Sequence, residues 1–212
     1  PTRRSSDLEY PECGVEYYEF EGKKYRFYEE GDYFARWVKS QNDKGITVNV
    51  QFMVRWEDNE ADKLTGRRIL IDEDARHKTS ALYYAPAVSG EGRQAMRAFW
   101  SWFMEHLAHY NAHVDNFILG NEVNMPNTWH YSGDVGTRTT VEKYATAFYD
   151  MHQIVRNYTG NARCSICVDH SWTHDDEGRG IAAKDYIQIF HDTLTYLNNG
   201  ATLDDWCVSL HL

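Results

Sequence analysis

The sequence predicts an α/β protein in which a parallel sheet is covered by helices. Apolar runs rich in β-forming residues alternate with segments whose apolar residues recur at the helical period, an order typical of parallel strands joined by helical crossovers. No glycine-rich phosphate-binding turn follows a strand, whereas polar residues stand at the strand ends and long aromatic loops come next. These observations favour a partial (β/α)8 barrel, the TIM barrel, over an open doubly wound sheet. The four parallel strands predicted for this chain amount to about half of such a barrel, which runs to roughly 250 residues.

The strands are predicted from β-forming runs bounded by turn residues. Residues 16–28 alternate around Gly22 and indicate a β-hairpin. Parallel strands are expected over residues 46–56, over an apolar run that ends at Leu119, over residues 162–172 and over residues 205–212. Residues 57–90 are polar and irregular, with an ordered piece expected at 81–88.

The helices are predicted from apolar residues that recur every three or four positions. The segments that show this pattern are residues 32–44, 91–110, 139–158 and 181–197. Gly45 and Gly160 are expected to end the first and third of them, since glycine readily adopts the backbone conformation found at helix C-termini. Thr139 and Glu142 form the Thr-x-x-Glu pattern of a capping box, which predicts where the third helix begins.

Composition and charge limit the class of protein. A chain of 212 residues with 42% hydrophobic content is long and apolar enough for one globular core. The net charge of -10 argues against nucleic acid and anionic membranes as partners, because phosphate binding uses clustered Lys and Arg. No apolar run approaches the ~20 residues of a membrane-spanning helix. The 15 Tyr and 7 Trp include flat rings of the kind that stack on sugars, although we expect most of them in the core.

The two ends of the chain differ from its middle. Residues 1–8, PTRRSSDL, are basic and polar and contain no initiator Met, so we expect a non-native segment outside the fold. Residues 209–212 lie inside an apolar, strand-like run, where domains seldom end. We therefore expect residues 9–212 to form a partial barrel domain that is truncated at both ends.

One spacing superficially suggests zinc. Cys164, Cys167, His170 and His174 form a C-x2-C-x2-H-x3-H pattern. Because residues 162–172 are expected to be a strand, side chains alternate, and Cys164 and His170 then face one side while Cys167 faces the other. Four ligands could not converge without breaking the strand. We expect buried thiols here, and neither a metal nor another cofactor in the protein.

Residues 115–123, DNFILGNEV, are the most informative segment. An apolar run ends abruptly in Gly120-Asn121-Glu122, which predicts a buried strand that delivers an amide and a carboxyl to its C-terminal end. In an α/β barrel the chemistry takes place at that end. Glycoside cleavage needs an acid to protonate the leaving oxygen and a second carboxylate, about 5–5.5 Å away in retaining enzymes. Glu122 is a candidate for the acid, and the alternative is that it caps a loop or pairs with an arginine.

This Gly-Asn-Glu after an apolar strand resembles the fourth strand of the clan A glycoside hydrolases, the retaining TIM-barrel glycosidases. The segments YEFEGKKYRFY, NDKGITVNVQFMVRW, FILGNEVN, VDHSW and SLHL resemble more closely an uncharacterised bacterial family of that structural group, a domain of unknown function. The resemblance covers residues 18–211 and implies that the four parallel strands are the third to sixth of the barrel. It also implies an oligo- or polysaccharide substrate and favours a secreted or cell-surface location.

The resemblance implies roles for individual residues. Glu122 matches the general acid/base, and Asn121 matches the amide that holds the 2-hydroxyl of the sugar. His211, at the end of the sixth strand, matches a site histidine. The nucleophile of these enzymes is a glutamate after the seventh strand, which lies beyond residue 212, so we expect this chain to be inactive by itself.

Other candidate substrate-binding residues stand at strand ends and in loops. His170 and Trp172 share one face of the strand expected at 162–172 and either point into the site or, for His170, bond a neighbouring carbonyl. Arg55 and Trp56 end the strand expected at 46–56 and either reach a sugar or pin the loop. Trp129 follows the Gly-Asn-Glu motif, and we expect it to form part of a subsite wall.

Two other classes of protein remain open. One is a carbohydrate-binding barrel without hydrolytic activity, which a glutamate after the seventh strand would argue against. The other is a metal-dependent hydrolase built on His170, His174 and His211, which a stoichiometric zinc content of the purified protein would favour.

Overall fold

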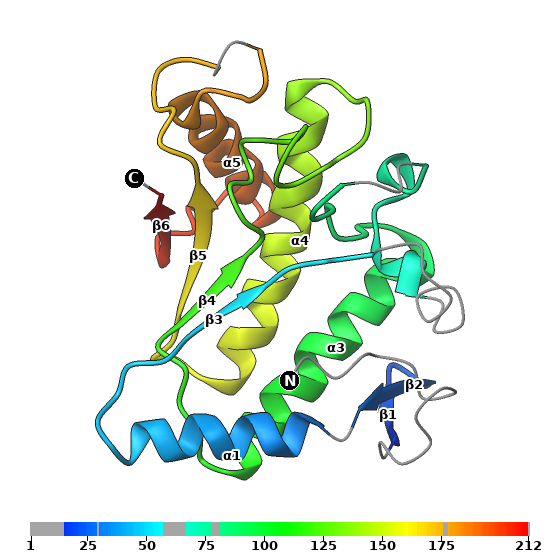
Figure 1. Ribbon diagram of the computed structural model, residues 1–212, viewed down its shortest axis with the longest axis vertical. Helices are drawn as coiled ribbons and strands as arrows, with labels where there is room; N and C mark the ends of the chain where they lie inside the picture. Colours follow the sequence, from blue (N-terminus) through cyan, green and yellow to red (C-terminus); the bar gives the residue numbers. More distant parts are fainter. Residues whose placement is uncertain (1–14, 29, 57–66, 78–80, 176–177, 212) are drawn as a thin grey trace.

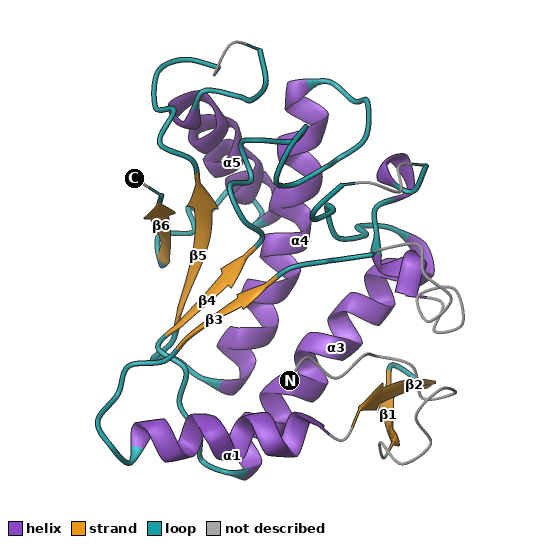
Figure 2. Cartoon of the chain, viewed as in Figure 1, coloured by secondary structure: helices purple, strands orange, loops and turns teal. Residues whose placement is uncertain are grey.

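The protein is a mixed α/β structure, seen here in a computed structural model that describes residues 15–28, 30–56, 67–77, 81–175 and 178–211 (Figures 1 and 2). The expected non-native segment 1–8 lies outside these residues. The main body is a parallel sheet with helices interleaved between its strands, as predicted. A small antiparallel hairpin and one further helix precede it in the chain.

The parallel sheet has the spatial order β3-β4-β5-β6, which is also the order along the chain. Its strands are β3 (Asn49–Phe52), β4 (Asn116–Leu119), β5 (Arg163–Val168) and β6 (Trp206–Leu210). The crossovers are α3 (Gly90–His109), α4 (Thr137–Tyr158) and α5 (Ala183–Leu197). Each strand therefore pairs with the next one along the chain, and all the strand C-termini meet at one edge of the sheet.

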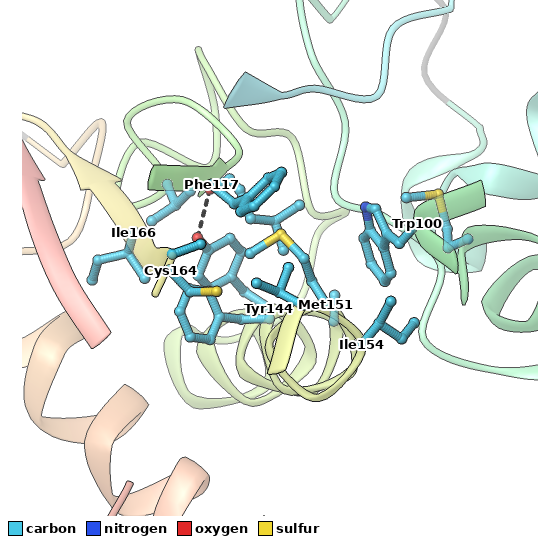
Figure 3. Close-up of a cluster of buried hydrophobic side chains, with 14 of the residues drawn as sticks. Trp100, Phe117, Tyr144, Met151, Ile154, Cys164 and Ile166 are labelled. Carbon is cyan, nitrogen blue, oxygen red and sulfur yellow. Dashed lines mark hydrogen bonds between the residues drawn. The ribbon is translucent and has the colours of Figure 1, made fainter. Parts of the chain in front are cut away.

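The core lies between the sheet and its helices. Alternate strand residues such as Phe117 and Ile166 point towards α4, where they pack with Tyr144 and Met151 (Figure 3). The buried hydroxyl of Tyr144 donates a hydrogen bond of 2.6 Å to the carbonyl oxygen of Leu119, the last residue of β4. Burying each such side chain stabilises the fold by about 1.5–3 kcal/mol. The hydrogen bond from Tyr144 to Leu119 ties α4 to the end of β4, the point from which the chain turns towards Glu122.

The opposite face of the sheet is more polar. Strand alternation gives this face Gln51 on β3, Ile118 on β4, Ser165 and Cys167 on β5, and Ser209 on β6. The register pairs Gln51 with Ile118 and Cys167 with Ser209. The helices thus cover the apolar face of the sheet. The opposite face carries the polar side chains that lie near the edge where the strands end.

The N-terminal elements pack against α3. The hairpin predicted at 16–28 is confirmed as β1 (Val15–Phe20) and β2 (Lys23–Tyr28), and α1 (Glu30–Asn42) follows it. The indole N–H of Trp102 donates to Glu16 at 2.9 Å. His106 lies between Glu16 and Asp32. Its Nε2 is 2.8 Å from a carboxylate oxygen of Glu16, and its Nδ1 is 2.8 Å from one of Asp32. These contacts fasten the hairpin and α1 to α3.

Two short 3-10 helices precede α3 in the chain, and the first of them contacts α3. They are η1 (Arg67–Leu70) and η2 (Glu73–Ala75). Asp72 is 1% exposed, accepts a hydrogen bond from the backbone N–H of Asp74 and pairs with Lys143 of α4 at 2.6 Å. None of the described helices has the length and apolar character needed to cross a membrane.

Several predicted boundaries were wrong. The strands expected at 46–56 and 162–172 are shorter, since β3 covers four residues and β5 ends at Val168. The side chain of Asp169 accepts a hydrogen bond from the N–H of Ser171 at 2.9 Å, and this local turn ends β5. The Thr139 capping box is also wrong, because α4 begins two residues earlier and its N-cap, Gly136, makes no side-chain cap bond.

Candidate functional site

The candidate site lies at the edge where the parallel strands end. Glu122 follows β4, Asp169 and His170 follow β5, and His211 follows β6. Parallel strands place all their C-terminal ends on the same side, so residues far apart in sequence meet here. The edge carries both hydrogen-bond acceptors and titratable groups.

A tight turn delivers Glu122 to this edge. Gly120 has a φ of 73° and Glu122 a φ of 43°, both in the left-handed region. The region suits Gly120, but it costs a residue with a Cβ such as Glu122 about 1–2 kcal/mol. A hydrogen bond of 2.8 Å from the N–H of Met125 to the carbonyl oxygen of Glu122 closes the turn. Strain of this kind is concentrated at functional sites in proteins.

The carboxyl of Glu122 meets the ring of His211. Oε1 of Glu122 lies 2.9 Å from Nδ1 of His211, and the Glu122 side chain is only 15% exposed. Their strands, β4 and β6, are separated by β5, and neighbouring strands lie about 4.8 Å apart. The two side chains therefore span the end of β5 to reach each other. Glu122 therefore pairs with a histidine, and not with an arginine as the alternative interpretation expected.

Asn121 is held from the other side by β3. The amide nitrogen of Gln51 donates to the carbonyl oxygen of Gly120 at 2.8 Å and to Oδ1 of Asn121 at 3.3 Å. This orients the Asn121 amide so that its oxygen faces Gln51. Asn121 and Glu122, adjacent in sequence, thus take their partners from β3 and β6.

Cys167 lies beneath these groups near the end of β5. Its Sγ is 3.4 Å from Nε2 of His211 and 4.0 Å from Oδ1 of Asn121. The residue is 1% exposed, and burial raises the pKa of its thiol. Together with Gln51, Asn121, Glu122 and His211 it forms what we call the strand-end cluster. Cys164 faces the helices instead, so the prediction that the two cysteines lie on opposite faces is confirmed.

His170 makes a separate pair. Its Nδ1 lies 2.7 Å from Oδ2 of Asp169, and its side chain is 66% exposed. Burial alone would raise the pKa of Asp169, but hydrogen bonds from Ser171 and from His170 outweigh it and lower that pKa. The prediction that His170 and Trp172 share a strand face is wrong, because both follow the end of β5. Trp172 is 49% exposed in this loop.

The aromatic and basic residues expected around the site have different environments. Trp56 is 3% exposed and packs with Ile71 and Tyr84, with the guanidinium of Arg68 4.8 Å from its ring. Its burial contradicts contact with a sugar and favours the alternative that it pins the loop. Arg55 is exposed beyond the end of β3, and Trp129 is partly exposed in the turns that follow Glu122.

Asn124 supports the site, although sequence reasoning did not identify it. Its side chain is fully buried, accepts a hydrogen bond from the N–H of Asp169 at 2.7 Å and donates one to the carbonyl oxygen of Ile181 at 3.0 Å. It therefore joins the turn after β4 to the end of β5 and to the start of α5. An asparagine in the turn that follows an apolar strand was a signal for such a bridge.

His130 packs behind the Gly120 turn. Its ring is 1% exposed, and neither ring nitrogen has a hydrogen-bond partner among the residues that the structure describes. Burial lowers the pKa of His130 to about 4, so the ring is neutral at pH 7. A Cβ on Gly120 would come within 3.0 Å of its Nδ1. His130 therefore acts as a packing element that shapes the turn from behind.

Gln51 and Cys167 were also missed in the sequence. Gln51 stands in an otherwise apolar run, and strand alternation places Cys167 on the face opposite Cys164. Both features were visible in the sequence, but neither indicated which residues these two side chains would contact. Within the described ranges, no three His, Cys, Asp or Glu side chains converge in a way that could hold a metal ion.

One family model matches nearly the whole chain. A model described as a family of unknown function (DUF5722) matches residues 6–212. The chain therefore belongs to this family. A comparison with curated proteins found no match.

Proposed function

We propose that this protein acts as a retaining glycoside hydrolase, with Glu122 as its general acid/base. The observation that carries the proposal is the position of the Glu122 carboxyl. It is mostly buried at the C-terminal end of a parallel strand, with His211 2.9 Å away and Asn121 beside it. A carboxyl that is shielded from water and held by a titratable partner is suited to give up and take back a proton.

We further infer that the sheet is part of a (β/α)8 barrel, in which β3 to β6 are the third to sixth strands. Three features support this: the strands are parallel, their spatial order follows the chain, and helical crossovers join them. In this arrangement the polar face that carries Gln51 and Cys167 is the barrel interior. The strand-end cluster then lies at the barrel mouth, where such enzymes bind substrate.

In the proposed reaction Glu122 donates its proton to the leaving oxygen and later accepts a proton from the attacking water. His211 holds the carboxyl in place through Nδ1. The amide of Asn121, fixed by Gln51, contacts the 2-hydroxyl of the sugar. The second carboxylate forms the covalent sugar adduct. By the family resemblance it follows a seventh strand and so lies downstream of residue 212, about 5–5.5 Å from Glu122 in the folded enzyme.

The proposed substrate is an oligo- or polysaccharide. Trp172 is 49% exposed in the loop after β5, and the partly exposed Trp129 follows the Glu122 turn. Flat apolar rings at these positions suit the faces of sugar rings. The net charge of -10 favours a neutral polymer over a polyphosphate such as nucleic acid.

The test uses the protein expressed through the seventh strand. Glu122→Gln is compared with wild type on aryl glycosides with good and with poor leaving groups. We expect a loss of about 100- to 10,000-fold on poor leaving groups, which need the proton, and a much smaller loss in the first step on good ones. Glu142→Gln, at a partly exposed position on α4, is the matched control and keeps full activity. Full activity of Glu122→Gln on poor leaving groups would overturn the proposal.

Binding measurements separate hydrolysis from binding alone. Titration calorimetry with oligosaccharides on wild type and Trp172→Ala measures whether the loop aromatic contributes to affinity. Binding without hydrolysis of any glycoside would instead favour a carbohydrate-binding barrel without catalytic activity.

A further inference from the structure

Cys167 occupies an unusual position for a buried thiol, because it contacts His211, the histidine that contacts Glu122. The sheet register produces this contact. Cys167 is paired with Ser209, and the N–H of His211 donates to the carbonyl oxygen of Val168 at 3.0 Å. The ladder thus continues past the end of β6, and alternation places His211 on the same face as Cys167. The 3.4 Å between Sγ and Nε2 follows from that register.

The two ring nitrogens of His211 connect Glu122 to Cys167. Nδ1 of His211 faces Glu122 and Nε2 faces Cys167. When Nδ1 carries the ring proton it donates to Oε1 of Glu122, which accepts either as a carboxylate oxygen or as the carbonyl oxygen of the acid form. In the neutral ring Nε2 is left as an acceptor. Burial raises the pKa of the Cys167 thiol, which keeps its proton and can donate it to Nε2.

The order Cys–His–Glu also resembles a nucleophilic triad, but the chemistry of Cys167 argues against that role. A nucleophilic cysteine acts as a thiolate in a partly exposed, electropositive environment that lowers its pKa. Cys167 is 1% exposed, and its environment shifts the pKa in the opposite direction. The thiol is therefore suited to donate a hydrogen bond and not to attack a substrate.

We propose that Cys167 is a positioning residue whose S–H holds His211 as the Nδ1–H tautomer and so keeps that N–H directed at Glu122. The catalytic consequence of this inference rests on the proposed function. The tautomer is a property of the strand-end cluster itself and can be measured without substrate. A secondary acceptor, Oδ1 of Asn121, lies farther from Sγ at 4.0 Å, so the histidine is the preferred partner.

The experiment observes the imidazole nitrogens of His211 by long-range 1H–15N NMR of the labelled chain. Loss of a signal set in His211→Gln assigns the ring. We expect the neutral form of the wild-type ring, recognised by its 15N shifts, to be the Nδ1–H tautomer. Cys167→Val removes the donor at similar volume, and the ratio of Nδ1–H to Nε2–H tautomer should fall by about fivefold, the effect of one weak hydrogen bond. Cys167→Ser supplies an O–H at the same place and should restore the wild-type ratio.

The control is Cys207→Val, which changes a partly buried cysteine on the same face of β6 and should leave the His211 signals unchanged. A wild-type ring in the Nε2–H form overturns the inference without any variant, so the result does not depend on how well Cys167→Val folds. An unchanged ratio in folded Cys167→Val also overturns it. Alkylation of Cys167 by iodoacetamide faster than that of Cys207 would indicate a reactive nucleophile instead.

The two proposals can fail separately. If Glu122→Gln keeps activity on poor leaving groups while the tautomer depends on Cys167, only the glycosidase assignment fails. If the tautomer is independent of Cys167 while Glu122→Gln loses activity, only the positioning role fails. If both hold, Cys167→Val in the protein that carries the seventh strand should shift the pH profile of hydrolysis, and Cys167→Ser should restore it.

Discussion

Glu122 and His211 leave strands that are not neighbours in the sheet, yet Oε1 and Nδ1 of these residues lie 2.9 Å apart. The intervening strand β5 contributes Cys167 below the pair and, through Asn124, fixes the turn on which Glu122 stands. The geometry of the carboxyl therefore depends on residues from all four parallel strands or from the turns that follow them.

Asn124→Asp should destabilise the protein by about 3 kcal/mol or more at pH 7.5, because a buried carboxylate cannot donate to the carbonyl oxygen of Ile181. Burial raises the pKa of such a carboxyl above its unfolded value of about 3.9, so the penalty is absent below that value and grows as the pH rises. Urea unfolding at pH 7.5 and pH 5 should thus show a smaller loss at the lower pH. Asn161→Asp, at an exposed position in the turn between α4 and β5, is the control and should change stability by less than about 0.5 kcal/mol.

Gly120→Ala should cost about 2–4 kcal/mol, because a left-handed φ and a steric clash act together. The added Cβ would lie 2.7 Å from Cγ1 of Val123 and 3.0 Å from Nδ1 of His130. Gly22→Ala is the matched control, since Gly22 has a similar φ of 76° but no atom within 4 Å of the added Cβ. It should cost only about 1 kcal/mol. Equal losses of thermal stability for both variants would show that packing behind the turn is unimportant.

Gln51→Met should cost about 1–2 kcal/mol, because it keeps the volume of the side chain but removes the donor to Gly120 and Asn121. The side-chain amide signals of Asn121 should shift or broaden in 15N NMR spectra as its orientation is lost. Gln188→Met, which removes an exposed bond to Asp192 within α5, should cost only about 0.2–0.5 kcal/mol. Sharp, unshifted Asn121 signals in Gln51→Met would contradict this positioning role.

His130→Phe should remove one part of the acid sensitivity of the fold. The pKa of buried His130 is lowered from 6.5 to about 4, so its stabilising contribution is complete above pH 6.5 and is lost as the pH falls towards 4. At 1.36 kcal/mol per pKa unit, that loss is about 3 kcal/mol. The variant should therefore gain about this much relative to wild type between pH 7.5 and pH 4, measured by denaturant unfolding. His191→Phe, on the surface of α5, should follow the wild-type curve.

Elements with a strong periodic signal were predicted well. The long helices α3 and α4 and the hairpin β1–β2 agree with the predictions to within two residues at each end. The strands were predicted too long, because the polar turns that end β3 and β5 still contain β-forming residues such as Trp56 and Trp172. Propensity does not reveal where a side chain such as Asp169 takes over a backbone hydrogen bond.

The sequence by itself determined the α/β order, the parallel sheet and the arrival of Asn121 and Glu122 at a strand end. All of these follow from local patterns of period two or 3.6 and from residues adjacent in the chain. Only the tertiary structure decided that His211 meets Glu122, that Cys167 and Gln51 complete the cluster, and that Trp56 is buried. The contacts within the cluster join residues 44 to 89 positions apart, and the burial of Trp56 depends on packing against Ile71 and Tyr84. No local pattern encodes such strand register and packing.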